Sequence, residues 1–154
     1  MNTTPIKIWT DGSAKGNGTK NARGGYAYII EYPGQTIERS YGEVNTTNQR
    51  MELQAAVAAL EAFSRSHFNH HPAVVYSDSA YLVNCWKDGW WVNWKSNGWK
   101  NSKKDPVANQ DLWKRLIPFF QLAFIRFEKV KGHSGNEMNE RVDTLAQNAS
   151  TSLD

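Results

Sequence analysis

The stretch Ile6-Lys7-Ile8-Trp9-Thr10-Asp11 indicates how the fold begins, because apolar and polar side chains alternate along its first residues. Such alternation is typical of a β-strand. Asp11 stands directly before Gly12, so we expect the strand over 6–10 to end on a carboxylate. A second short apolar run, 73–77, ends in the same way on Asp78. Because ligands bind at the carboxyl ends of strands in open α/β sheets, the two aspartates together indicate a candidate site. For either aspartate taken alone, a helix cap or a turn former is the more common role.

The elements around these two strands predict an α/β fold. We expect strands at 26–32 and 36–41, joined as a hairpin through 33–35, and a Gly-rich loop over 12–25. The remaining elements are expected as a helix at 48–63, a broken helical region at 79–96 interrupted at Gly89, a helix at 109–120, a strand at 124–130 and a helix at 136–149. Three consecutive strands followed by alternating helices and strands indicate a mixed sheet whose later strands are parallel.

The length of the chain favours one domain over 1–154, and its composition excludes several classes of protein. Hydrophobic residues make up 40% and charged residues 21%, which excludes a disordered or fibrous chain. A single cysteine, Cys85, excludes an intramolecular disulfide and a Cys-based zinc cage. No apolar run approaches the roughly 20 residues of a membrane span, and 1–5 lack a secretory signature. We therefore expect a cytoplasmic monomer with no membrane contact and a frayed tail at 150–154.

Tryptophan and positive charge concentrate in one segment. Six of the seven tryptophans lie between positions 86 and 113. Residues 86–115 include seven basic and three acidic side chains, a net charge of +4, whereas the whole chain carries +3. Flat indole rings can pack on deoxyribose while lysines hold phosphates, so the segment is a candidate nucleic-acid interface. The alternative is local packing, since Trp86, Trp90 and Trp94 follow helical i, i+4, i+8 spacing.

Two further acidic residues lie on helices expected to pack on the sheet. Glu52 shares the small, apolar face of the helix at 48–63, so it is expected to point inward. A buried carboxylate needs a partner, which is either a metal ion or a cation such as Arg50 or Lys7. Asp143 lies beside the apolar face of the last helix, where an ordinary solvated aspartate is the alternative.

Asp11, Glu52, Asp78 and Asp143 together form a candidate metal site. Carboxylates without cysteine or clustered histidine favour hard cations such as Mg²⁺ or Mn²⁺. Four carboxylates carry a charge of about −4, which two divalent ions neutralise, and two such ions about 3.5–4 Å apart can promote phosphodiester hydrolysis. His133, in a Gly-rich loop, could move protons or assist product release, although an exposed loop histidine fits equally well.

Six blocks of sequence, in this order, resemble the signature blocks of type 1 ribonuclease H. They are Thr10-Asp11-Gly12-Ser13, Gly24-Gly25-Tyr26, Thr47-Asn48-Gln49-Arg50-Met51-Glu52-Leu53, Ser77-Asp78-Ser79, Val130-Lys131-Gly132-His133-Ser134-Gly135 and Asn139-Glu140-Arg141-Val142-Asp143. The resemblance extends from about Ile6 to Ala149. It implies a ribonuclease H-like fold, with a five-stranded mixed sheet of three antiparallel then two parallel strands and helices on both faces. Within the Trp-rich segment (residues 86–115), the part at about 86–108 resembles the basic protrusion of bacterial-type members.

The resemblance also implies an activity and a set of site residues. Family members cleave the RNA strand of RNA–DNA hybrids and leave 3′-hydroxyl and 5′-phosphate ends. The implied cofactor is Mg²⁺ or Mn²⁺, bound as two ions when substrate is present. The carboxylates named above match the metal ligands, and His133 matches the loop histidine. Positions expected to contact the hybrid are Asn17, Asn48 and Gln49 on the RNA strand, Thr47 and Asn109 at a DNA phosphate, and Trp90, Trp94, Lys95, Trp99 and Lys100 in the protrusion.

Departures from the family pattern concern affinity more than chemistry. Asn45 stands where arginine is frequent, Ala80 where glutamine or methionine is common, and Asp105 and Ala108 where lysine is frequent. The sequence leaves two other functions open. One is a hybrid-binding module without activity, against which the complete set of four carboxylates argues. The other is a different nuclease or a transposase of the same superfamily, against which the Gly-His-Ser-Gly loop and the protrusion argue.

Overall fold

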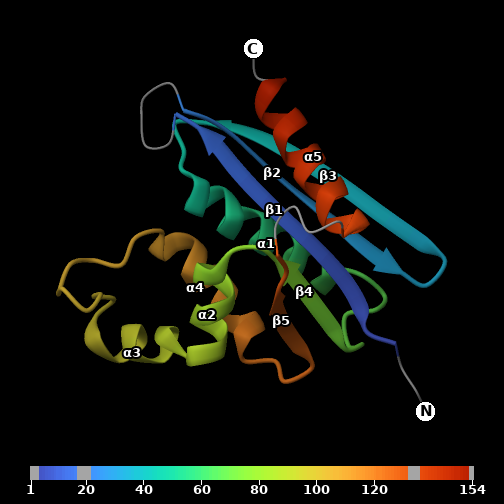
Figure 1. The fold of residues 1–154 in the computed structure, drawn as a ribbon. Helices are drawn as coiled ribbons and strands as arrows, with labels where there is room; N and C mark the ends of the chain where they lie inside the picture. Colours follow the sequence, from blue (N-terminus) through green and yellow to red (C-terminus); the bar gives the residue numbers. More distant parts are fainter. Residues whose placement is uncertain (1–3, 17–21, 132–135, 153–154) are drawn as a thin grey trace.

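A computed structural model describes residues 4–16, 22–131 and 136–152, and the structural statements below concern those residues. The elements, in chain order, are β1 (Ile6–Lys15), β2 (Arg23–Tyr32), β3 (Gln35–Val44), α1 (Asn48–Ser64), β4 (Ala73–Ser77), α2 (Ala80–Asp88), α3 (Trp90–Asn97), α4 (Gln110–Phe120), β5 (Ile125–Lys129) and α5 (Glu137–Thr151). Figure 1 shows them in a single body, with the loop between α3 and α4 projecting to one side.

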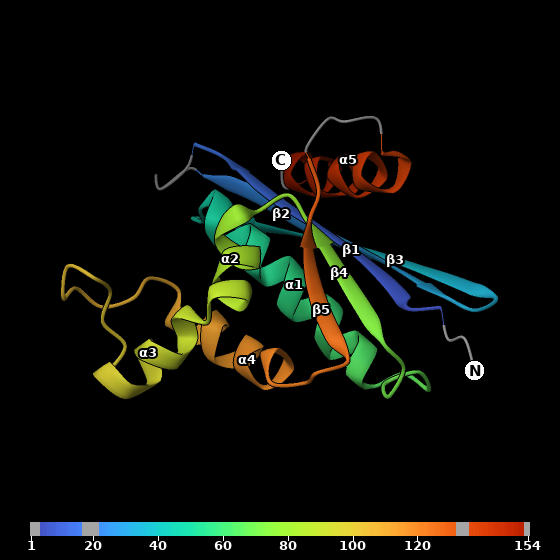
Figure 2. The same ribbon diagram turned by 60° about the horizontal axis from the view of Figure 1, so that its bottom comes forward.

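The sheet has five strands in the order β3-β2-β1-β4-β5. The β1–β2 and β2–β3 pairs are antiparallel, whereas β1–β4 and β4–β5 are parallel. Figure 2 shows α5 on one face of the sheet and α1, α2 and α4 on the other. The predicted α/β fold, with three antiparallel strands, two parallel strands and helices on both faces, is therefore confirmed.

The alternation along β1 divides the core between the two faces. Ile6 and Ile8 belong to the large cluster that includes the buried side of α1 and α4. Trp9 faces the other way and packs with Val142 and Ala146 of α5. The period of two that predicted this strand thus also decides which helix each side chain meets.

The first strand is longer than predicted, which changes the place of Asp11. The polar, Gly-rich residues after it suggested a loop, but β1 continues to Lys15 and pairs with β2 as far as Lys15↔Arg23. Asp11 is therefore inside the strand, opposite Ala27, and not at its end. Pairing with a neighbouring strand outweighs the weak β-propensity of glycine and other small residues, which a single segment does not reveal.

The last helix also exceeds its predicted end. The tail was expected to fray from residue 150, yet α5 continues to Thr151 and Ser150 is only 4% exposed. The last turn of α5 packs directly against the strand backbone at Gly25. A Cβ at this position would lie 2.0 Å from the Ala146 carbonyl oxygen and 2.8 Å from the Ser150 nitrogen. Helix and strand backbones are thus in close contact.

None of the helices in the described ranges combines the length and the hydrophobicity that a membrane span requires.

The tryptophans of the Trp-rich segment extend the main core. Trp94 and Trp113 are buried, and the other four indoles of the segment are partly buried against the same cluster. The interruption predicted at Gly89 is confirmed, since this residue has φ 69° and separates α2 from α3. Positive φ is readily adopted by glycine, which has no Cβ. Local packing, the alternative left open by the sequence, therefore accounts for much of the tryptophan content.

Candidate active site

The site forms where the central strands part. β1 pairs with β4 only from Ile6↔Ala73 to Trp9↔Tyr76, and beyond this point β1 continues beside β2 alone. The edge of β1 that β4 leaves open needs other hydrogen-bond acceptors. Side chains of α1 supply them: the Gly12 N–H donates to Oε1 of Glu52 at 2.6 Å, and the Ala14 N–H donates to Oδ1 of Asn48 at 2.6 Å.

Gly12 permits this close approach of helix and strand. A Cβ at position 12 would lie 2.3 Å from the Met51 carbonyl carbon and oxygen, and 2.6 Å from the Glu52 nitrogen. These are backbone atoms, so a side chain at position 12 would force α1 away from β1. The Thr10-Asp11-Gly12 sequence therefore places a carboxylate next to the glycine at which Glu52 contacts the strand.

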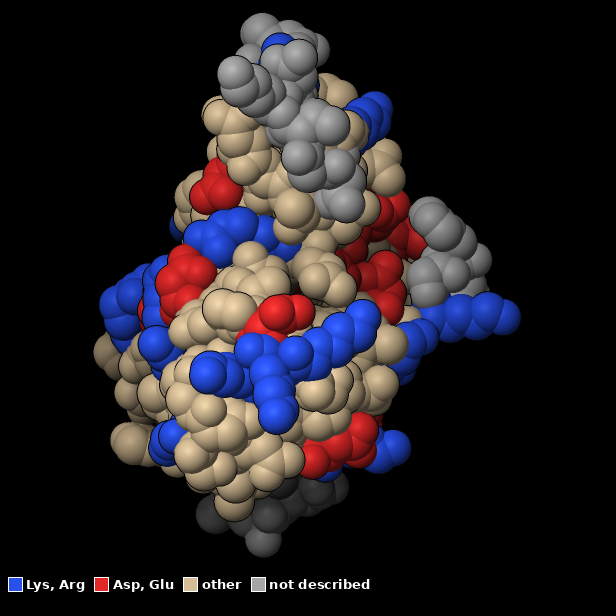
Figure 3. Space-filling model, turned by 90° about the vertical axis from the view of Figure 1, so that its left-hand side faces the viewer, with Lys and Arg blue, Asp and Glu red and all other residues tan. Residues whose placement is uncertain are grey.

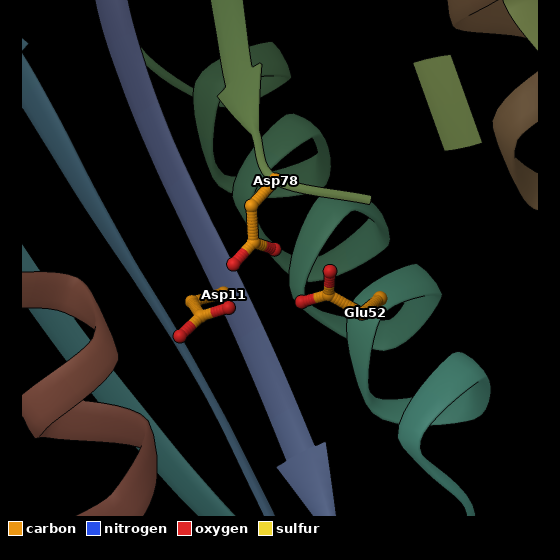
Figure 4. Close-up of side chains that lie close together, drawn as sticks. All are labelled: Asp11, Glu52 and Asp78. Carbon is orange, nitrogen blue, oxygen red and sulfur yellow. The ribbon is translucent and has the colours of Figure 1, made fainter. Parts of the chain in front are cut away.

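Three carboxylates meet at this opening. One oxygen each from Asp11, Glu52 and Asp78 lies within 4.8 Å of the others. Figure 4 shows the three side chains pointing toward one another from β1, α1 and the end of β4. Asp143 approaches from α5, where hydrogen bonding to it is one of the causes that raise the pKa of Asp11. The structure thus brings all four predicted acids to one place, with Asp143 adjacent to the central three.

The electrostatics of this cluster are unfavourable without a cation. Burial, followed by hydrogen bonding to Asp143 and the charge of Asp78, raises the pKa of Asp11 from 3.8 to about 8. Burial and the neighbouring charge of Asp11 likewise raise the pKa of Glu52 well above its ordinary value. Like charges and burial both disfavour the ionised form. A set of oxygen ligands with this excess negative charge fits a hard divalent cation such as Mg²⁺ or Mn²⁺.

Arg50, one of the two cations considered as a partner for Glu52, is engaged elsewhere. Arg50 forms a bidentate pair with Asp111, at 3.0 and 2.7 Å, and does not neutralise Glu52. Among the described residues, no ion pair involves Asp11, Glu52 or Asp78. Asp143 accepts a hydrogen bond from Nε2 of Gln147 at 3.0 Å, so it is held in place on α5. These contacts favour a metal site over buried ion pairs.

The predicted substrate-contact residues gather at two helix starts. Thr47 caps α1, with its Oγ1 accepting from the Arg50 N–H at 3.1 Å, and Gln49 is exposed in the first turn. Asn109 occupies the N-cap position of α4, and its side chain accepts a hydrogen bond from Arg50 at 3.3 Å. Asn17 and His133 lie outside the described residues, so their roles stay predictions.

The predicted protrusion contacts divide between two pockets. Trp90, Trp94 and Lys100 line a pocket of about 420 Å³. Lys95 and Trp99 line a different pocket of about 430 Å³, together with Lys114 of α4. Figure 3 shows the face to which the protrusion projects, with basic side chains spread across it and acidic patches interspersed among them. The five residues therefore line two pockets, which adjoin where the rings of Trp94 and Trp99 lie 5.9 Å apart.

Sequence reasoning missed two parts of this region. Tyr81 lines the pocket of Trp90 and Trp94, with its ring 5.7 Å from that of Trp90. Its place two residues after the Ser77-Asp78-Ser79 block was the available signal. The contact of Arg50 with Asn109 and Asp111 joins residues 59 and 61 positions apart, and no local pattern indicates it.

Comparisons with known proteins agree with this geometry. A family model described as RNase H matches residues 3–151. The ribonuclease H of Syntrophomonas wolfei is 51% identical over 148 residues, which cover 96% of this chain and 97% of that protein. The ribonuclease H of Moorella thermoacetica is 43% identical, with 96% and 93% covered. LC9-RNase H1, a type 1 RNase H with the type 2 active-site motif, has 27% identity and a TM-score of 0.79, covering 100% of this chain and 75% of that one.

Proposed function

Because this chain belongs to the ribonuclease H family, whose members hydrolyse RNA in RNA–DNA hybrids, we propose that it is a divalent-metal-dependent endoribonuclease acting on such hybrids. Its products would carry 3′-hydroxyl and 5′-phosphate ends. The observation that carries this proposal is the convergence of Asp11, Glu52 and Asp78, with ligand oxygens within 4.8 Å of one another. Mg²⁺, with Mn²⁺ as a substitute, is the proposed cofactor, bound as two ions when substrate is present.

Each carboxylate has a defined part in this proposal. Asp11, Glu52, Asp78 and Asp143 would hold the metal, which would supply activation of a water and stabilisation of negative charge on the leaving oxygen. The Gly12 N–H orients Glu52 by donating a hydrogen bond to its Oε1. Asp143 is steadied by Gln147. Because protein groups hold these carboxylates in advance, little reorganisation is needed when the metal and substrate arrive.

The substrate would be recognised by its backbone and sugars. Asn17, Asn48 and Gln49 are the proposed RNA-strand contacts, since amides can both donate to and accept from a 2′-hydroxyl. Thr47 and Asn109 form the proposed binding site for a phosphate of the DNA strand. Trp90, Trp94, Lys95, Trp99 and Lys100 complete the proposed contacts along the protrusion. Trp90, Trp94 and Lys100 line one pocket of the protrusion, and Lys95 and Trp99 line another.

The loop histidine has an accessory role in this proposal. His133 would move a proton or help product leave, so His133→Ala is expected to slow turnover without abolishing it. Complete loss of turnover in a folded variant would assign His133 a more direct role.

We also propose a monomer in the cytoplasm, which sedimentation of the purified protein and fractionation of the source cells would test.

The deciding experiment is cleavage of a hybrid labelled on its RNA strand. With Mg²⁺ we expect internal cuts and products that a ligase requiring 5′-phosphate and 3′-hydroxyl ends can rejoin. RNA–RNA and DNA–DNA duplexes should stay intact, and removal of the metal by a chelator should stop cleavage. A protein that binds the hybrid but leaves it uncut with Mg²⁺ or Mn²⁺ would instead be a hybrid-binding module.

A further inference from the structure

Arg50 joins the two helix starts at which the proposed DNA phosphate would sit. Its guanidinium forms the bidentate pair with Asp111 and donates to Oδ1 of Asn109 at 3.3 Å. Its backbone N–H donates to Oγ1 of Thr47 at 3.1 Å. One residue of α1 thus contacts the caps of both α1 and α4.

These contacts decide which groups the two caps can offer to a ligand. Arginine has donors and no acceptor, so it selects the oxygen of the Asn109 amide and turns the NH₂ group to the other side. Thr47 accepts from the backbone, which leaves its hydroxyl proton available for donation. The Thr47 hydroxyl and the Asn109 NH₂ group are therefore both available as donors. This suits a phosphate oxygen, which accepts hydrogen bonds without donating any.

The backbone at Asn109 supports this interpretation. Asn109 has φ 60°, in the left-handed region, and its side chain makes no capping hydrogen bond with α4. Asparagine at a helix start normally uses its oxygen to cap the first N–H groups. Here that oxygen contacts Arg50 instead, so the local role of the side chain has been given up for a contact between helices.

From this arrangement we propose that Arg50 is a positioning residue, which orients the Asn109 amide so that its NH₂ group donates to a backbone phosphate of the DNA strand. The proposal rests on the proposed function. Asp111 serves the same end by holding the guanidinium in a fixed plane through its two oxygens. The effect of Arg50 therefore depends on its fork geometry as well as on its charge.

The chain contains a matched control for this proposal. Arg115 of α4 pairs with Glu61 of α1 through two hydrogen bonds, so it links the same two helices. Both pairs are partly exposed, with side-chain exposures of 33% and 59% for Arg50 and Asp111 and of 47% and 33% for Arg115 and Glu61. Breaking the Arg115–Glu61 pair would therefore test only the link between α1 and α4. Among the described residues, no hydrogen bond joins Arg115 to an N-cap residue.

The test compares KM, kcat and metal-free binding of hybrid for wild type and variants. Arg50→Ala should raise KM about 3- to 10-fold, as expected when one hydrogen bond is removed, with kcat nearly unchanged. Arg50→Lys should not restore KM, although it keeps the charge. Arg115→Ala should leave KM unchanged. In a protein that already carries Asn109→Ala, the further change Arg50→Ala should raise KM little more, because the amide that Arg50 orients is already missing.

Asp111→Ala separates orientation from charge. Removing a negative charge near a phosphate would tighten binding if charge alone acted, whereas a positioning role predicts weaker binding. The proposal is overturned if Asp111→Ala tightens binding, if Arg50→Lys behaves as wild type, or if Arg115→Ala matches Arg50→Ala. A wild-type protein that neither binds nor cleaves hybrid would instead refute the proposed function, so the two failures are distinguishable.

Discussion

The carboxylate site and the Trp-rich segment have opposite effects on the stability of the fold. At the carboxylate site, like charges are held together by the fold, and burial raises the pKa of Asp11 and Glu52. In the Trp-rich segment, the indoles pack on the main core, while Lys95, Lys100 and Lys103 are exposed. One region is therefore costly to the fold without metal, whereas the other adds to the core.

This difference separates chemistry from affinity. Changes to the carboxylates should alter turnover while leaving the fold intact or more stable, because they remove repulsion. Changes to the indoles should alter stability first, since these rings fill the core. Changes to exposed lysines should alter neither, and should act on KM and on its salt dependence.

The greatest loss is expected for Asp78→Asn. Replacing one carboxylate of the metal site should lower turnover in Mg²⁺ by more than about 100-fold, because even residues that only support metal ligands typically account for 10- to 100-fold. Asp88→Asn is the matched control, since Asp88 is exposed at the end of the following helix. Circular dichroism should show both variants folded. Turnover close to wild type in Asp78→Asn would remove this residue from the metal site.

Trp94→Ala should test the packing role of the Trp-rich segment. The Trp94 ring lies 5.9 Å from that of Trp99 and 5.4 Å from that of Trp113, and the residue is only 8% exposed. We expect a loss of about 3–5 kcal/mol in the free energy of unfolding. Trp90→Ala, at a partly exposed ring of the same pocket, should cost less stability. Denaturant titration measures both, and equal losses would contradict the distinction between the two rings.

Hybrid binding by these two variants is expected to weaken even at low salt. Rings that line the pocket provide packing against sugar, and this contact does not depend on charge. The measurement is hybrid affinity at a temperature where each variant is fully folded. Affinities equal to that of wild type would show that the pocket of Trp90 and Trp94 does not hold the substrate.

The metal-free protein should lose stability as pH rises from about 4 to about 8. Asp11 has a pKa of 3.8 when unfolded and about 8 when folded, so within this window the folded chain keeps a proton that the unfolded chain has lost. The free energy of unfolding then falls with rising pH. Asp11→Asn should flatten this dependence and raise Tm near neutral pH, by about 2–4 °C for each kcal/mol gained. Thermal unfolding with a chelator measures both, and an unchanged slope in Asp11→Asn would contradict the assignment.

Neutralising four lysines of the protrusion should change affinity without changing chemistry. The substitutions are Lys95→Ala, Lys100→Ala, Lys103→Ala and Lys104→Ala. We expect KM to rise several-fold and the salt slope of binding to flatten, by roughly 0.9 for each phosphate that the protein no longer neutralises. Saturated turnover should change little, because uniform binding affects KM alone. An unchanged KM and salt slope would show that the hybrid is held elsewhere.

The smallest effect is expected for Asp105→Lys. Asp105 is exposed, and its backbone closes the turn at Asn101 through N–H and carbonyl hydrogen bonds that any side chain would permit. The added positive charge should tighten hybrid binding slightly and steepen the salt slope. Affinity equal to wild type at low salt would show that position 105 faces away from the duplex.

The sequence by itself determined the elements and the candidate chemistry. Period-two alternation indicated β1, and the apolar run at 73–77 matches β4 residue for residue. The small, apolar face around Glu52 indicated an inward carboxylate, because a helix repeats every 3.6 residues. These are local signals, readable from a few neighbouring residues. The α/β fold and the set of four acids were therefore predictable.

Only the tertiary structure decided how distant groups meet. β1 extends past Asp11 because β2 and the side chains of Glu52 and Asn48 provide its hydrogen-bond partners, all from elsewhere in the chain. Trp99 lines a pocket with Lys114 because α3 and α4 pack on one core. Arg50 meets Asn109 across 59 positions for the same reason. Hydrogen bonding and burial depend on neighbours in space, which no local period of the sequence encodes.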